Sequence, residues 1–539
     1  MLLNKSNDKG VSKKINVDLN QTFNVSNSSL KKVVRGTIIG IIGSIIVIPL
    51  AFIAKVILAR FFTPAEFGIY SLGFSIISIL VVISLLGLST GTARQIAYYR
   101  GKKNFLQVQG IISSSIQISI ISSLILTLIV ILTSDFLSIT IFHNSTLSIP
   151  LMIFAISVPL MTIHNVLISI YIGFDRIEEI VYFENILRNL LFVVLLLPIV
   201  FFSFSIHYAI IAFLFSYILT LIAFVIYTKK RLPFSLIRTK GIHPITSIYK
   251  DLLLFSIPLL SIALFQTILE WTDTLMLGIM RTLGEVGLYN AAHPIADFIN
   301  ISMAALLFIF APIITGLYAK EAFSEIRRNY YILTKWVFLT SLPFFLIIFL
   351  FPQIFLGFLF GSDYVLASTA LQVLAVGWII ANFLGPNGTT LVAIGQTRFL
   401  MWACIAAAGM NIILNVLLIP PMGIVGASIA TSISINFHCI LRQMKVHSIL
   451  KINPITRNYL KPTIISVSLI LIIWYLIGSY LFITYWMLPL IFIFIVIVIF
   501  LIVLFTRSLE QEDIMMLLAI EKRIGINLSP IKKILNKFL

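Results

Sequence analysis

The residues of this 539-residue chain that could do chemistry are charged side chains inside long apolar segments. Five stand out: Lys55, Arg188, Glu270, Asp273 and Asp297. A charge near the centre of a bilayer costs about 2.5 to 3.5 kcal/mol on insertion scales, so such residues normally face a bundle interior and have a partner. In a water-filled cavity, cations of this kind could hold an anionic head group. The carboxylates could accept protons, a cation or sugar hydroxyls.

Two alternatives stay open for these charges. Lys55, Glu270 and Asp273 lie at a similar depth by residue count, so Lys55 could form a buried ion pair that only neutralises one of the carboxylates. Arg188 could extend its head group to the inner interface of the membrane. As the functional hypothesis, we assign Glu270, Asp273 and Asp297 to ion coupling. Lys55 and Arg188 are assigned to substrate binding.

Uncharged polar residues complete the candidate binding set. Asn185 and Asn189 share a helical face with Arg188, and we include both, together with Asn387, among the substrate-binding candidates. Four asparagines in the second half of the chain could contact sugars or bond across helices: Asn382, Asn387, Asn411 and Asn415. His164 and His293 are more typical of hydrogen-bonded packing residues than of ligands.

Composition identifies the elements that must position these side chains. The chain is 59% hydrophobic and 11% charged, whereas soluble domains are about 45 to 50% apolar and about 25% charged. Lipid offers no partner to unpaired backbone groups, and the apolar runs are too long for barrel strands, so they predict an all-α membrane protein. Fourteen transmembrane helices are expected, near 36–59, 68–90, 108–132, 148–172, 180–202, 206–227, 251–279, 287–316, 332–358, 366–393, 399–419, 423–443, 460–482 and 485–506.

The chain is internally duplicated. TPAEFGIY at 63–70 matches TLGEVGLY at 282–289, in register and 219 positions apart. A second block agrees at a spacing of 222: Gly173, Arg176, Asn189 and Pro198 match Gly395, Arg398, Asn411 and Pro420. Parallel repeats of this kind predict two equivalent lobes around a central site. Gly68 and Gly287 begin equivalent spans, where we expect tight packing or a positive φ.

Basic residues predict the orientation. If residue 1 is cytoplasmic, 34 of the 38 Lys and Arg residues fall in the termini or in loops after even-numbered spans, including 94–103, 229–250, 320–335 and 442–461. Both termini are therefore expected in the cytoplasm. Arg60 and Arg281 fall at the opposite face, where we place them at the rim of the cavity. The net charge of +18 fits an anionic inner leaflet, and no nucleic acid partner is needed.

These patterns predict six regions. They are a disordered cytoplasmic tail (1–34), an N lobe (35–228), a cytoplasmic linker (229–250), a C lobe (251–445), two further helices (446–506) and an amphipathic cytoplasmic tail (507–539). Predicted external loops are too short for a soluble catalytic domain, and no nucleotide-binding motif is present. Cys404 and Cys439 lie in apolar segments and form no zinc or disulfide pattern. We therefore predict neither an enzyme nor a cofactor or metal site.

A glycine- and proline-rich stretch interrupts the tenth span. Gly385, Pro386 and Gly388 could suggest a phosphate loop, but the Lys-Ser/Thr ending of that motif is missing. A broken helix lining a cavity is the better interpretation, because backbone groups freed at membrane depth must face protein or water.

Several segments together carry a family resemblance. They are ILARFFTPAEFGIYSL at 57–72, WTDTLMLG at 271–278, EVGLYNAA at 285–292, GPNGTTLVAIGQTR at 385–398 and NIILNVLLIPPMGIVGASIATSIS at 411–434. Over residues 36–506 the chain resembles Wzx-type oligosaccharide flippases, polysaccharide transporters of the multidrug, oligosaccharidyl-lipid and polysaccharide (MOP) exporter superfamily. The resemblance implies two six-helix bundles, spans 1–6 and 7–12, related by a pseudo-twofold axis along the membrane normal, followed by two extra helices.

The function that the resemblance implies is transport of a lipid-linked oligosaccharide on a polyprenyl phosphate or pyrophosphate, across the cytoplasmic membrane and by alternating access. The product would serve surface polysaccharide or glycoprotein glycan assembly, with glycan-assembly enzymes as partners. A multidrug cation antiporter of the same superfamily is the main alternative, although it would be expected to have an acidic, aromatic site. A lipid II flippase and a membrane polysaccharide polymerase are further alternatives. The polymerase would need a long external loop, which this chain lacks.

The orientation can be tested with reporter fusions. A reporter after Ser362 should map to the outside and one after Lys240 to the cytoplasm, because the positive-inside rule places these segments on opposite faces. The reverse result at either position would contradict the topology and the assignment of the lobes.

Overall fold

The computed structural model describes residues 49–176, 178–231, 246–454, 457–478, 483–506 and 508. Every regular element in these residues is helical, and eleven helical segments among them are long and apolar enough to cross a membrane. The predicted all-α membrane class is therefore confirmed. The predicted tail 1–34, nearly all of 507–539 and most of the linker 229–250 lie outside the described residues.

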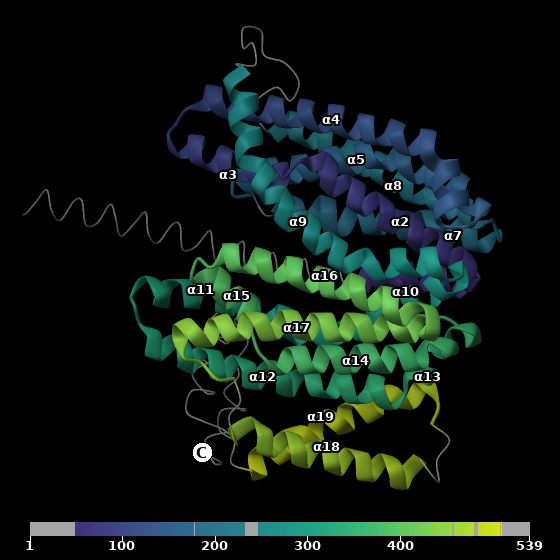
Figure 1. Ribbon diagram of the computed structural model, residues 1–539, viewed down its shortest axis with the longest axis vertical. Helices are drawn as coiled ribbons and strands as arrows, with labels where there is room; N and C mark the ends of the chain where they lie inside the picture. The colour runs from purple at the N-terminus through teal and green to yellow at the C-terminus, as the bar shows by residue number, and fades with distance from the viewer. Residues whose placement is uncertain are drawn as a thin grey trace, which may run out of the picture.

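The N lobe occupies the upper part of Figure 1. Its helices are 49–61, α2 (Pro64–Leu85), α3 (Leu88–Gly101), α4 (Phe105–Phe136), η1 (Leu137–Ile141), η2 (Ser145–Leu147), α5 (Ser148–Gly173), α6 (Glu178–Ile180), η3 (Val181–Leu187), α7 (Arg188–Phe201) and α8 (Ile206–Arg231). The η3 segment is a π-helix, a rare form that is frequent at functional sites.

The C lobe follows and lies below the N lobe in Figure 1. Its helices are α9 (Thr246–Met280), α10 (Leu283–Asp297), η4 (Phe298–Asn300), α11 (Ile301–Ala319), α12 (Phe323–Leu350), α13 (Pro352–Leu359), η5 (Ser362–Ala367), α14 (Ser368–Phe383), α15 (Asn387–Ala393), α16 (Thr397–Met422) and α17 (Ile424–Leu450). A last pair, α18 (Arg457–Gly478) and α19 (Leu488–Phe505), preceded by η6 (Tyr485–Met487), packs against α12 at the far side of the C lobe.

Helix α9 contacts both lobes. Near its start, Ser256 packs against α3 so closely that a Cβ at Gly87 would lie 2.0 Å from the Ser256 carbonyl oxygen. The hydroxyl of Tyr249 donates to the side chain of Gln117 on α4. Further along, α9 packs against α16 of the C lobe. The predicted start of the C lobe at residue 251 thus falls within a helix that contacts both lobes.

The duplicated motif is a helix-capping signature. In the first copy Thr63 caps α2, because its hydroxyl accepts from the Glu66 backbone N–H at 3.3 Å and the Glu66 carboxylate accepts from the Thr63 N–H at 3.0 Å. In the second copy the Thr282 hydroxyl caps α10 by accepting from the Glu285 N–H at 3.3 Å. We call the end of the bundle that carries Thr63 and Thr282 the outer end, following the predicted orientation.

Glycines let α2 and α10 touch at the outer end. A Cβ at Gly68 would lie 1.8 Å from the Leu283 carbonyl oxygen, and a Cβ at Gly287 would lie 1.9 Å from that of Pro64. Neither glycine has a positive φ. Tight packing is therefore the reason for these glycines, and it joins equivalent helices of the two lobes.

Three basic segments that were expected to be loops are largely helical. Helix α3 continues to Gly101, α12 begins at Phe323, and α17 continues to Leu450. The positive-inside rule reports the side of the membrane on which a charge lies and carries no information about secondary structure. One consequence is that Arg442 belongs to a transmembrane helix.

The glycine contact generates a stability prediction. Gly68→Ala and Gly287→Ala should each lower the thermal unfolding midpoint of the purified protein, because overpacking typically costs about 1 to 3 kcal/mol. Gly409→Ala is the matched control, since a Cβ there meets no atom within 4 Å and alanine is intrinsically the better helix former. Equal midpoints for all three variants would contradict the close contact.

Candidate functional site

Asp273 is the centre of a buried polar cluster in the C lobe. Its side chain is 2% exposed, and it accepts hydrogen bonds from residues of three other helices. The donors are Tyr289 Oη (2.6 Å) on α10, Asn411 Nδ2 (3.1 Å) and Asn415 Nδ2 (2.7 Å) on α16, and the Thr431 hydroxyl on α17. These donors replace water around a carboxylate at membrane depth. The two asparagines therefore bond across helices, one of the two roles considered for them.

The ion pair considered between Lys55 and Asp273 is not formed. Both carboxylate oxygens of Asp273 are engaged by uncharged donors, whereas Lys55 is exposed. Glu270 is also exposed, although it precedes Asp273 by only three residues. Three residues advance a helix by about 300°, and the remaining 60° is enough to turn one side chain into the C lobe and the other out of it.

Lys55 belongs to a second charged cluster. It interacts electrostatically with Asp297 and Glu270, and no ion pair of 4 Å or less forms to it within the described residues. His293 Nδ1 lies 3.2 Å from Asp297 Oδ2, one helical turn away. Three of the predicted residues thus come together from helix 49–61, α9 and α10, and His293 joins them. This cluster contains two carboxylates for one lysine.

Arg188 lies in a third cluster, inside the N lobe. Its guanidinium forms an ion pair with Glu184 at 3.0 Å and donates to Tyr217 Oη at 2.6 Å and to Asn189 Oδ1 at 3.2 Å. His164 Nε2 lies 2.7 Å from the other carboxylate oxygen of Glu184. Arg188 is therefore neutralised inside the lobe.

The sequence reasoning missed Glu184. The signal was available, because a carboxylate four residues before an arginine in one apolar segment occupies the same helical face. Asn185 lies beside this cluster in the chain, and its carbonyl oxygen accepts from Asn189 Nδ2 at 2.7 Å.

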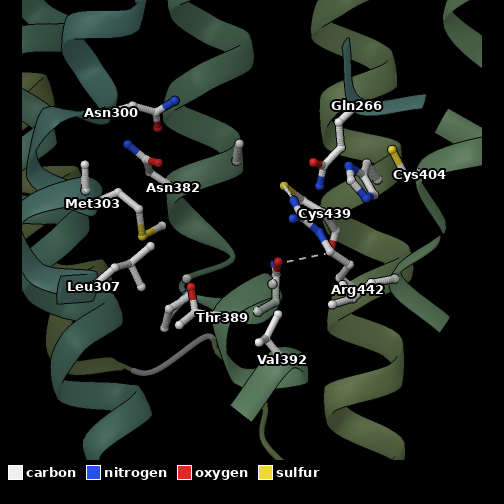
Figure 2. A pocket seen from close by; sticks show the side chains of 18 of the residues that line it. Gln266, Asn300, Met303, Leu307, Asn382, Thr389, Val392, Cys404, Cys439 and Arg442 are labelled. Carbon is white, nitrogen blue, oxygen red and sulfur yellow. Dashed lines mark hydrogen bonds between the residues drawn. The ribbon is translucent and has the colours of Figure 1, made fainter. Parts of the chain in front are cut away.

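A cavity of about 720 Å³ opens among the C-lobe helices. Helix α14 ends at Phe383 and α15 begins at Asn387, so the predicted break in the tenth span is confirmed, and Gly385 and Pro386 line the cavity. Asn387 also lines it, while donating to the Cys439 carbonyl at 3.3 Å. Figure 2 shows Asn300 and Asn382 on one side, facing Gln266 and Arg442 on the other. Arg442 had been assigned to a cytoplasmic loop.

The two rim arginines bind carbonyl groups at helix ends. Arg60 Nη1 donates to the Gly357 carbonyl of α13 at 3.2 Å. Arg281 Nε pairs with Glu285 at 3.0 Å, and its Nη1 donates to the Pro420 carbonyl of α16 at 3.4 Å. A cation at a helix C-terminus is stabilising, so both residues tie elements together at the outer end.

Comparisons with known proteins agree with this architecture. Residues 33–318, more than half of the chain, match the family described as polysaccharide biosynthesis protein, and residues 258–417 match the MatE family. The chain belongs to the polysaccharide biosynthesis protein family. The resemblance to flippases of the MOP superfamily is thereby confirmed, and members of this family are transporters rather than catalysts.

The relatives of this chain include a probable low-salt glycan biosynthesis flippase, Agl15 of Haloferax volcanii. The two are 28% identical over 183 residues, which span 34% of this chain and 39% of the relative. Among solved structures, the lipid II flippase MurJ in an inward closed conformation has a TM-score of 0.68 at 14% identity, covering 86% of this chain and 97% of MurJ. An inward-facing multidrug resistance MATE transporter has a TM-score of 0.65 at 17% identity, covering 75% of this chain and 95% of the transporter. At these identities the two structures establish the fold alone.

The Glu184–Arg188 pair predicts a double-mutant result. Glu184→Leu alone should lower folded yield and thermal stability strongly, because an uncompensated buried charge typically costs about 3 to 5 kcal/mol. Adding Arg188→Met should restore most of that stability. Asp175→Asn, which removes the charge from the exposed ion pair with Arg100 and suits the positive φ of this position, is the control and should change stability little. A double variant as unstable as the single one would show that charge neutralisation is not the role of the pair.

Proposed function

We propose that the protein is a flippase for oligosaccharides linked to a polyprenyl phosphate or pyrophosphate, destined for surface polysaccharide or glycoprotein glycans. The observation that carries this proposal is the chemistry of the C-lobe cavity. Among the described residues, its lining includes four amide side chains and one arginine, and no Asp or Glu. Amides suit sugar hydroxyls, and an arginine suits phosphate. A cation antiporter would need carboxylates there, which makes multidrug export the weaker candidate for this cavity.

The proposed mechanism is alternating access between the two lobes. The glycine contact between α2 and α10, together with the rim arginines, closes the outer end in this conformation. Separation of the same helices would open the cavity to the outside. The protein would operate in the cytoplasmic membrane with both termini in the cytoplasm, and glycan-assembly enzymes would deliver or consume its substrate.

Asp273 is the proposed coupling residue. Its four donors come from α10, α16 and α17, and Asn415 Oδ1 beside it is a buried acceptor without a partner among the described residues. Binding of a proton or a monovalent cation would change this hydrogen-bond set. Because α9 packs on both lobes, such a change would reach the interface between them. Glu270 and Asp297 remain proposed contributors through the Lys55 cluster.

We propose that the other predicted substrate-binding residues also contribute to binding. Lys55 is exposed and Asn387 lines the C-lobe cavity. Arg188, Asn185 and Asn189 lie in the N lobe, where the pair with Glu184 would have to open before Arg188 could hold a phosphate.

Reconstitution into vesicles tests the function and the coupling together. The wild-type protein should move a fluorescent polyprenyl-diphosphate-linked oligosaccharide between leaflets, measured by accessibility to a membrane-impermeant quencher. Asp273→Asn should slow this transfer about tenfold or more, because hydrogen bonds to a charged group are worth roughly 1.5 to 3 kcal/mol each. Asp251→Asn, at an exposed position of the same helix, should leave the rate unchanged.

The outcomes separate the two claims. A wild-type protein that moves no lipid-linked glycan contradicts the flippase proposal. A wild-type rate in Asp273→Asn contradicts only the coupling role.

A further inference from the structure

Arg442 is a transmembrane cation that has no counter-ion among the described residues. Helix α17 places it on the wall of the C-lobe cavity, half-buried. In contrast to Arg188, which pairs with Glu184, Arg442 has no carboxylate within 4 Å among the described residues. The one hydrogen bond found for it there is from Nη2 to Cys439 Sγ, a weak acceptor, at 3.0 Å. A charge in this position normally has an anionic partner.

Space for the guanidinium is provided by Gly388. A Cβ at this position would lie 2.7 Å from Arg442 Nη1. The broken tenth span, which brings Gly388 to the cavity wall, thus also permits the observed position of Arg442. Figure 2 shows Arg442 on the same side of the cavity as Gln266, and Thr389 at the lower edge of the cavity.

Other nitrogen atoms of the cavity lining are in a similar position. Trp378 Nε1, His438 Nε2 and Arg442 Nε are all buried, and none has a hydrogen-bond partner in the described part of the chain. Tryptophan and arginine nitrogens can only donate, and the histidine nitrogen can donate in one of its tautomers. Buried polar groups are normally hydrogen-bonded, so each such exception calls for an explanation. Donors of this kind around one cavity suit a ligand that is rich in acceptors.

Snorkelling is the alternative explanation for Arg442. A long side chain near a membrane interface can extend its charged head into water. It does not account for the contact with Gly388, which directs the guanidinium toward the cavity wall. Nor does it account for the partnerless nitrogens of Trp378 and His438.

We propose that Arg442 and the wall around Gly388 form a binding site for the diphosphate of a lipid-linked glycan. This inference rests on the proposed flippase function and assigns the anionic part of the substrate to the C lobe. The fork of an arginine matches the geometry of phosphate oxygens. Gln266 lies on the same side of the cavity as Arg442, and Asn300 lies across from them. Both amides suit sugar hydroxyls, while Trp378 offers an aromatic face.

The volume of the cavity agrees with this substrate class. A site of about 720 Å³ falls in the range of roughly 300 to 1,000 Å³ that is usual for small-molecule sites. It can hold a diphosphate and the first sugars, while the polyprenyl chain stays in the bilayer.

Calorimetric titration of the full-length protein in nanodiscs tests the site with three probes: farnesyl diphosphate, inorganic pyrophosphate and farnesol. Farnesyl diphosphate should bind the wild type, and Arg442→Gln should weaken binding about tenfold or more, as expected for loss of a charge-assisted bidentate contact. Arg442→Lys should be intermediate, because it keeps the charge and loses the fork. Arg327→Gln, which removes an exposed cation from α12, should bind like the wild type.

Gly388→Ala keeps the proposal testable if Arg442→Gln folds poorly. It retains every charge but moves the guanidinium, so it should also weaken farnesyl diphosphate binding. Ligand-induced change in tryptophan fluorescence should disappear in Trp378→Phe, which places the bound molecule in this cavity.

Three results would overturn the proposal. The first is equal affinity of the wild type and both Arg442 variants for farnesyl diphosphate. The second is equal affinity of the wild type for farnesol and farnesyl diphosphate. The third is equal affinity for inorganic pyrophosphate and farnesyl diphosphate, which would indicate a free anion as the ligand. Failure of the proposed function can be distinguished from failure of this site. If the wild-type protein binds farnesyl diphosphate through Arg442 but moves no lipid-linked glycan, the binding site stands and the flippase function is wrong.

Discussion

The constraint on which the structure depends is the absence of water from the hydrocarbon layer. Every polar group at that depth must find its partner in the protein, in a cavity or in a ligand. Asp273 meets this condition with four uncharged donors, and Arg188 meets it with a carboxylate, a tyrosine and an asparagine. Arg442 does not meet it within the described residues. The way in which its charge is satisfied therefore sets Arg442 apart from Asp273 and Arg188.

The two lobes share a backbone plan but differ in electrostatics. The N lobe contains a compensated network in which Glu184 contacts both Arg188 and His164. The C lobe contains an anion held by neutral donors around Asp273 and, separately, a cation on a cavity wall. Duplication supplied equivalent helices, and later divergence placed different chemistry in them. This asymmetry suits the proposed transport of an anionic substrate coupled to a proton or a cation.

Helix α9 connects these parts. Its first half packs on α3 and α4 of the N lobe, and its second half carries Glu270 toward the Lys55 cluster and Asp273 into the C lobe. Gln266, between the two halves, lines the C-lobe cavity. One rigid element thus contacts both lobes, the buried carboxylate and the cavity. Packed interfaces of this kind tend to have discrete arrangements rather than continuous ones, which is what alternating access requires.

The sequence by itself determined the fold class, the duplication and the break at Gly385, because apolar length, repeat spacing and backbone chemistry are local properties of a chain. The same holds for the capping motif TPAE, whose bonds form within one turn. Only the tertiary structure decided the partners of the charged residues. A difference of 60° around α9 separates Asp273 from Glu270, and Arg442, predicted to lie in a loop, faces a cavity. Three of the four donors to Asp273, namely Asn411, Asn415 and Thr431, lie more than a hundred residues from it in the chain. The rotation of each helix about its axis decides which side chains meet. That rotation is set by packing, and periodicity in so uniformly apolar a chain does not encode it.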